Sequence, residues 1–138
     1  MVHALEKIHQ CLEPDGRRVD INPSGIPPTI EVRVGDQITP VGWMKETDDF
    51  FEYGQASDAL VQVVERGLFA VEREGGFEFT TRAGSVAELR GYLAKEWKDA
   101  ILDESAAARA EALLSAQSHD SELIVREQVR IARLKPLY

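Results

Sequence analysis

Two polar residues, Asp20 and Asn22, alternate with Val19 and Ile21 at the end of a short predicted strand. A carboxylate and an amide in this position can bind a polar ligand, because α/β sheets often bind ligands at the carboxyl ends of their strands. The alternative is structural, since the same side chains also cap strand ends or face solvent at an edge. The pattern predicts a ligand-binding position and assigns no catalytic residue.

Aromatic side chains gather in the segment that follows the first predicted hairpin. Trp43 and Tyr53 could form the walls of a small pocket, because ligand sites are mostly apolar with a few polar groups. Packing in the core or against a partner explains the same aromatics. The candidate ligand site therefore consists of Asp20, Asn22, Trp43 and Tyr53.

Other groups that could do chemistry have simpler explanations. Three carboxylates lie at the start of a predicted helix, namely Asp48, Asp49 and Glu52. A charged first helical turn accounts for them without a metal ion. His119 has no nucleophile at a defined spacing, and Cys11 is expected to be a small buried residue of the first helix. No metal site is predicted.

Composition narrows the class of protein. The chain has 138 residues, of which 43% are hydrophobic and 29% charged, as expected for one folded domain spanning residues 1–138. A net charge of −8 does not suit a generic binder of nucleic-acid backbones. One cysteine cannot form an internal disulfide, and no apolar run is long enough to cross a membrane. We expect a cytoplasmic protein without a signal peptide and without nucleic-acid or membrane partners.

Hydrophobic periodicity predicts an α+β fold, a mixed and largely antiparallel sheet with helices packed on it. The predicted helices cover residues 4–12, 47–66, 86–101 and 103–117. The predicted strands cover residues 17–21, 30–34, 37–43, 69–73, 77–80 and 122–134.

Three details of this prediction can be checked directly. Glu74-Gly75-Gly76 is expected to turn the chain between two short strands. The apolar stripe of the third helix is expected to continue through Trp97 to Ile101. One face of the last strand is expected to carry Leu123, Val125, Val129 and Ile131.

The first helix, turn and strand resemble a segment of a known family. The run from Ala4 to Ile21 is similar to the helix, "L-K-P-G-G" turn and fifth strand of class I S-adenosylmethionine-dependent methyltransferases. At the turn, Glu13 replaces the usual lysine and Asp15 replaces the first glycine. In that family the seventh strand lies antiparallel between the fifth and the sixth. The resemblance therefore implies the C-terminal half of a Rossmann-like methyltransferase fold, with its seventh strand at 122–134.

The cofactor-binding parts of that family have no counterpart in this sequence. The glycine-rich loop and the acidic residue that holds the ribose precede this turn in the family, and no G-x-G-x-x-G occurs here. The resemblance implies no cofactor for this chain alone, and S-adenosylmethionine only if a separate N-terminal half exists. No functional residue is carried over.

Two hypotheses of function follow. The first is a truncated methyltransferase-like domain without activity of its own, acting as an assembly or regulatory module or as part of a split methyltransferase. Its first strand and the apolar face of its first helix (Leu5, Ile8 and Leu12) would lack neighbours, so we expect a homodimer. A monomer whose hairpin covers the strand edge is the competing arrangement. The second hypothesis is a small-ligand-binding protein or enzyme with a pocket near the four candidate residues.

Overall fold

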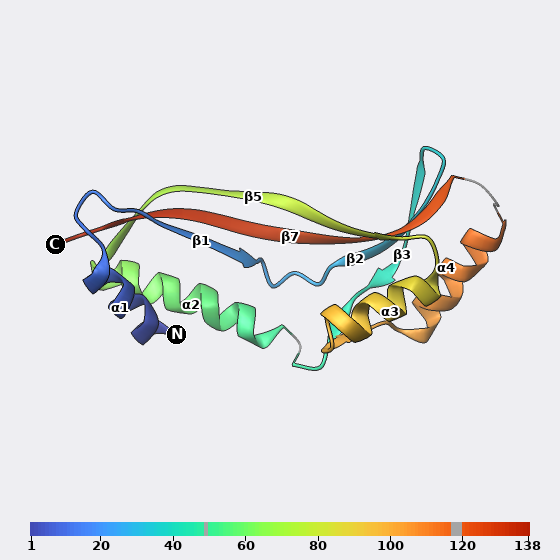
Figure 1. The fold of residues 1–138 in the computed structure, drawn as a ribbon, viewed down its shortest axis with the longest axis horizontal. Helices are drawn as coiled ribbons and strands as arrows, with labels where there is room; N and C mark the ends of the chain where they lie inside the picture. Colours follow the sequence, from blue (N-terminus) through green and yellow to red (C-terminus); the bar gives the residue numbers. More distant parts are fainter. Residues whose placement is uncertain (49, 117–119) are drawn as a thin grey trace. The chain divides into compact units, whose positions relative to one another are not determined.

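The computed structural model describes residues 1–48, 50–116 and 120–138, and the described chain is α+β with a mostly antiparallel sheet (Figure 1). Its helices are α1 (Val2–Cys11), α2 (Phe51–Glu65), α3 (Val86–Glu96) and α4 (Glu104–Ala116). Its strands are β1 (Arg18–Pro23), β2 (Thr29–Val34), β3 (Gln37–Trp43), β4 (Lys45–Glu46), β5 (Phe69–Ala83), β6 (Ala100–Ile101) and β7 (Ser121–Pro136). The predicted fold class is confirmed at this level.

The chain divides into two compact units. The terminal unit comprises residues 1–25, 51–77 and 128–138, and the central unit comprises residues 26–50 and 78–127. The long strands β5 and β7 contribute residues to both units. That residues 1–138 act as a single domain stays a prediction.

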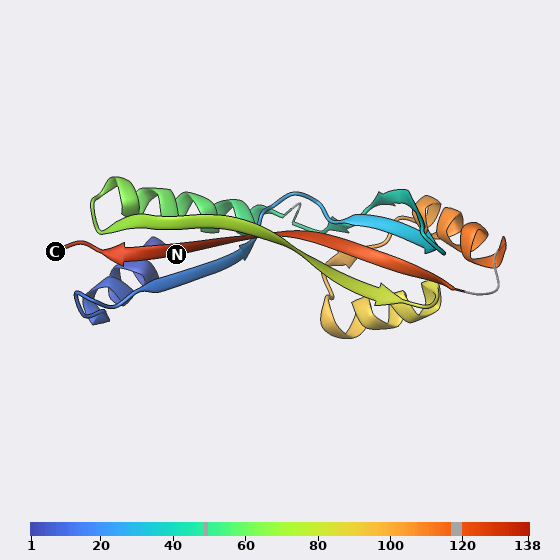
Figure 2. The ribbon, with the colours of Figure 1, turned by 90° about the horizontal axis from the view of Figure 1, so that it is seen from above.

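In the terminal unit, β7 lies between β1 and β5. β1 is antiparallel to β7, with Arg18 opposite Leu134 and Pro23 opposite Val129. On the other side of β7, β5 pairs with it and runs in the opposite direction (Figure 2). The expected placement of the last strand, antiparallel between the strands at 17–21 and 69–73, is confirmed.

Helices α1 and α2 of the terminal unit pack against each other and cover one face of its strands (Figure 1). The buried core consists of Leu5, Ala59, Leu60, Val63, Phe69, Ala132 and Leu134. Leu5 is only 4% exposed, because α2 and the sheet cover it within the chain. The expectation that the Leu5 face of the first helix is left open is therefore wrong.

Cys11 is exposed, although it was expected to be buried. Helix α1 reaches the core through Leu5, near its N-terminal end, while Cys11 is its last residue. Cys11 lines a shallow surface hollow together with Lys7, Ile8 and Leu12.

The central unit is built on the β2–β3 hairpin and the first part of β7. Both edges of β2 are paired, one with β3 and the other with β7, where Arg33 lies opposite Glu122. Gly35 forms the hairpin turn with a φ of 58°, which glycine adopts without strain. Helix α4 contacts both β2 and β3. The unit has its own core of thirteen buried residues, among them Ile30, Met44 and Leu89.

Glu74-Gly75-Gly76 does not turn the chain, so the predicted second hairpin is wrong. β5 is continuous from Phe69 to Ala83. Neither glycine has a positive φ, and a Cβ on Gly76 would lie 3.3 Å from the carbonyl oxygen of Val129 on β7. These glycines permit close approach of two strands, which is the other common role of glycine within a strand.

The apolar stripes predicted for the third helix and for the last strand also differ from the buried residues in the structure. α3 begins at the expected cap, where Ser85 Oγ accepts a hydrogen bond from the Glu88 amide at 3.1 Å, but it ends at Glu96. Ile101 lies on β6 and is 44% exposed. On β7 the core residues are Leu123 and Val125 in the central unit but Ala132 and Leu134 in the terminal unit. The residues of β7 that belong to the two cores thus change from odd to even numbers, and Ile124 is buried as well, so the predicted single face is wrong.

Candidate functional site

Asp20 is held by its neighbours on β1. Arg18 Nη2 donates a hydrogen bond to Asp20 Oδ1 at 2.8 Å, and Asn22 Nδ2 donates to Asp20 Oδ2 at 2.7 Å. The three side chains share one face because strand residues two apart point the same way. Both oxygens of the Asp20 carboxylate therefore have donors, and the group is arranged as an acceptor rather than as a free base.

Polar residues from other elements extend this cluster. Asn22 lies opposite Arg130 on β7, and Arg130 Nη1 donates to Ser57 Oγ on α2 at 3.4 Å. Tyr53 is one helical turn before Ser57. The structure thus adds Arg18, Ser57 and Arg130 to the surroundings of Asp20 and Asn22, none of which belonged to the predicted site of Asp20, Asn22, Trp43 and Tyr53.

The cluster on this face of β1 has a spare donor on Arg18, the first residue of the strand. Arg18 Nε is buried and has no hydrogen-bond partner among residues 1–48, 50–116 and 120–138. A buried polar group without a partner is costly, and one common remedy is a bound molecule. Arg130 also pairs with Glu74, at 3.8 Å, so the donor that this cluster leaves for an acceptor-bearing or anionic group is Arg18 Nε. One sequence signal could have indicated this cluster: Arg18 and Arg130 occupy strand positions that face a helix.

Trp43, the fourth predicted site residue, belongs to the central unit, whereas Asp20, Asn22 and Tyr53 belong to the terminal unit. Its side chain is 63% exposed and lines a surface pocket between β3 and α4. A single pocket formed by all four residues stays a prediction.

Asp48 has a structural role just before α2. Asp48 Oδ1 accepts a hydrogen bond from the Phe50 amide at 3.2 Å, and Phe50 has a φ of 61°. This left-handed residue explains why α2 begins at Phe51 rather than at Thr47. No cluster of three metal-ligating side chains occurs in the described part of the chain, and Asp49 and His119 lie outside it.

Glu127 is a carboxyl group to which no sequence pattern pointed. Burial raises the pKa of Glu127, and the negative charge of Glu46 raises it further. Glu46 in turn accepts a hydrogen bond from Trp97 Nε1 at 2.7 Å. Perturbed carboxyls are found both in functional sites and in structural networks. Here the tryptophan contact ties the pair to the packing of the central unit.

Comparison with protein-family models, curated proteins and solved structures finds no match to this chain. The family resemblance of residues 4–21 therefore stays a prediction. None of the helices in the described ranges is long and apolar enough to span a membrane.

Proposed function

We propose that this chain is a methyltransferase-like module without methyltransferase activity of its own, which functions by assembly. The observation that carries the proposal is the strand arrangement of the terminal unit. Its order is helix, strand, helix, strand, strand, with the last strand antiparallel between the other two. This arrangement corresponds to the fifth, sixth and seventh strands implied by the resemblance of residues 4–21.

The outer edge of β1 supports an assembly role. Among the described residues, β1 pairs only with β7, so its other edge has no strand beside it. Val19 and Ile21 on this strand are each 56% exposed. An unpaired strand edge readily recruits another strand, and the family resemblance implies a neighbouring strand at this edge. The partner is a second copy of the chain or the missing half of a split methyltransferase.

More than one register of self-assembly avoids like charges opposite each other. Pairing about Val19 places Arg18 opposite Asp20 but pairs only residues 18–20 of each β1, whereas pairing about Ile21 pairs residues 19–23. If two copies of β1 pair antiparallel about Ile21, Asp20 of one copy faces Asn22 of the other, and the two Ile21 side chains meet. Pairing about Asp20 would instead place two carboxylates opposite each other, which is destabilising. We infer that a homodimer would use the register centred on Ile21.

Cross-linking tests this register. In a Cys11→Ser background, Ile21→Cys should form a disulfide-linked dimer under mild oxidation, because residues directly opposite have Cα atoms about 4.5–5.5 Å apart, within disulfide range. Val19→Cys is the matched control, since its two copies would be too far apart. Equal cross-linking of both variants, or of neither, would contradict the register.

Cofactor binding tests the absence of activity. Calorimetric titration of the purified chain with S-adenosylmethionine should give no binding at micromolar concentrations, with a complete methyltransferase as the positive control. Micromolar binding by this chain alone would contradict the proposal.

A second candidate function, binding of a small polar ligand beside Arg18, Asp20 and Asn22 on β1, is favoured by the unpartnered Arg18 Nε beside Asp20. A thermal-shift screen of small carboxylates and phosphates should then yield a compound that stabilises the chain. The shift should disappear in Asn22→Ala and persist in Trp43→Ala. A compound whose effect depends on Trp43 instead would rule out this location.

A further inference from the structure

The pocket beside Trp43 has an apolar floor where a strand and a helix approach closely. It has a volume of about 370 Å³ and lies between β3 and α4. Val41, Gly42 and Ala106 contribute to its lining. A Cβ on Gly42 would lie 3.0 Å from the Cβ of Ala106, so glycine at this position is what allows α4 to lie so near the strand.

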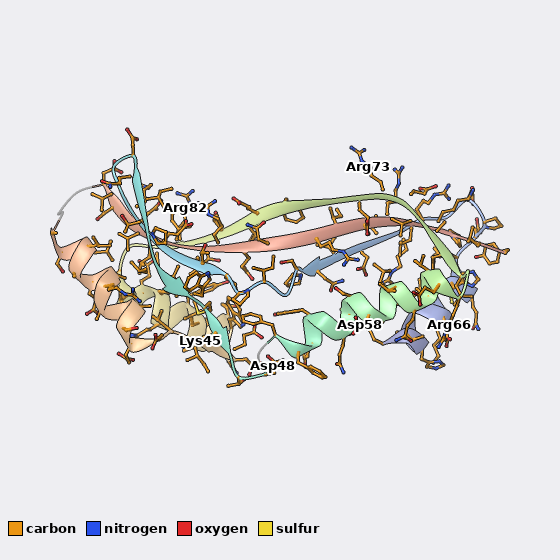
Figure 3. All side chains as sticks on the ribbon, turned by 180° about the vertical axis from the view of Figure 1, so that it is seen from behind. Lys45, Asp48, Asp58, Arg66, Arg73 and Arg82 are labelled. Carbon is orange, nitrogen blue, oxygen red and sulfur yellow. The ribbon has the colours of Figure 1, made fainter. Side chains whose placement is uncertain are left out.

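The rim of this pocket combines an exposed indole with two cations. Trp43 is 63% exposed, although burial of a tryptophan is strongly favourable. Lys45 and Arg109 line the same pocket (Figure 3 labels Lys45). Neither has an ion-pair partner within residues 1–48, 50–116 and 120–138, and Arg109 is held only by its Nε, which donates to the Ser105 carbonyl at 3.3 Å.

Asp103, the acidic residue of the pocket, already accepts a hydrogen bond. Ser105 Oγ donates a hydrogen bond to Asp103 Oδ2 at 2.7 Å, and this bond lowers the pKa of Asp103, with Lys45 and Arg109 lowering it further. Lys45, Arg109 and Asp103 all line this pocket. The pocket therefore carries two positive charges against one negative charge, and no described residue forms a hydrogen bond with the terminal nitrogens of Arg109.

We propose that this pocket binds a small planar aromatic carboxylate. The ring would stack on the exposed face of Trp43 above the floor formed by β3 and α4. The carboxylate would accept hydrogen bonds from Arg109, whose planar guanidinium fits a carboxylate in two-point contact, with Lys45 adding a second charge. The site is independent of the β1 edge on which the proposed function rests.

Nuclear magnetic resonance of the full chain tests this site with sodium benzoate as the probe. The chain has two tryptophans, and Trp43→Phe assigns the indole signal of Trp43. Benzoate should shift that signal in a saturable way, while the Trp97 signal stays in place. Benzyl alcohol, which lacks the charge, and cyclohexanecarboxylate, which lacks the planar ring, should each bind more weakly.

Variants assign the contacts. Arg109→Gln should weaken benzoate binding about tenfold, since it removes a charge-assisted hydrogen bond. The matched control is Lys95→Gln on α3, which removes an exposed cation that does not line this pocket and should leave the affinity unchanged. The unchanged amide spectrum outside the pocket shows that each variant is folded.

Three results would overturn the proposal. The first is no saturable shift of the Trp43 indole up to millimolar benzoate. The second is an equal response to benzyl alcohol or in Arg109→Gln. The third is a Trp43 signal that moves with protein concentration in the absence of benzoate, which would assign the pocket to a contact between copies of the chain.

Discussion

Arg33 donates a hydrogen bond from Nε to the carboxylate of Glu122 at 3.0 Å, directly across from it on the neighbouring strand. Arg82 from β5 donates to the same carboxylate oxygen. One carboxylate thus joins three strands of the central unit, β2, β5 and β7. The side chain of Glu122 is only 21% exposed, so this contact is partly shielded from water.

This contact predicts a loss of stability in acid. The hydrogen bond from Arg33 holds the pKa of Glu122 below its ordinary value, with Arg82 lowering it further. A carboxyl whose folded pKa is lowered stabilises the fold above its unfolded pKa, and this contribution is lost as the pH falls through the folded pKa. Urea titrations should show the free energy of unfolding falling below about pH 4.5.

Glu122→Gln provides the control for that prediction. The variant should be less stable than the wild type at pH 7, and its stability should change less between pH 5 and pH 3. Identical pH profiles of the two proteins would show that Glu122 is not among the groups responsible.

The two tryptophans should differ in their contribution to stability. Trp97 packs against the central core and donates its Nε1 hydrogen bond to Glu46, whereas Trp43 is 63% exposed. Trp97→Ala should lower the free energy of unfolding by about 2–4 kcal/mol, somewhat less than the same substitution of a fully buried tryptophan. Trp43→Ala, the same substitution at an exposed position, should cost less than about 1 kcal/mol. Equal costs in urea titrations would contradict the packing described here.

The β1 edge should determine the oligomeric state. Sedimentation equilibrium at micromolar concentration should give twice the 15.4 kDa mass of the chain. The double variant Val19→Lys, Ile21→Lys should sediment as a monomer, because lysines on an edge strand oppose pairing. Ile38→Lys on β3, also at an exposed position, is the control and should remain dimeric. A wild-type mass of 15.4 kDa would exclude the homodimer.

Gly42 should be intolerant of any side chain. A Cβ at this position would lie 3.0 Å from the Cβ of Ala106, so Gly42→Ala should cost about 1–3 kcal/mol through overpacking. Ala106→Gly in the same chain should recover part of the loss by removing the opposing methyl group. If the double variant is no more stable than Gly42→Ala, the contact between β3 and α4 is not the cause.

Local pattern was sufficient to predict most elements of this chain. Alternation of Ile30, Val32 and Val34 predicts β2, and the spacing of Ser85 and Glu88 predicts the start of α3, because each signal lies within one element. The placement of the last strand between the strands at 17–21 and 69–73 was also predictable, although from the family resemblance rather than from periodicity. The four candidate site residues were identifiable as polar or aromatic, but their partners were not.

Contacts between distant segments decided the features that local pattern did not predict. Gly75 and Gly76 have the composition of a turn, yet they remain extended because β5 pairs with a long strand that approaches Gly76 closely. The residues of β7 that belong to a core change from odd to even numbers because the strand contributes to two separate cores. Asp20 is engaged by Arg18 and Asn22 of its own strand, whereas Arg130 lies opposite Asn22 and reaches Ser57 only because strand register and helix packing bring these side chains together. Burial and pairing depend on neighbours far along the chain, and periodicity within one segment contains no information about those neighbours.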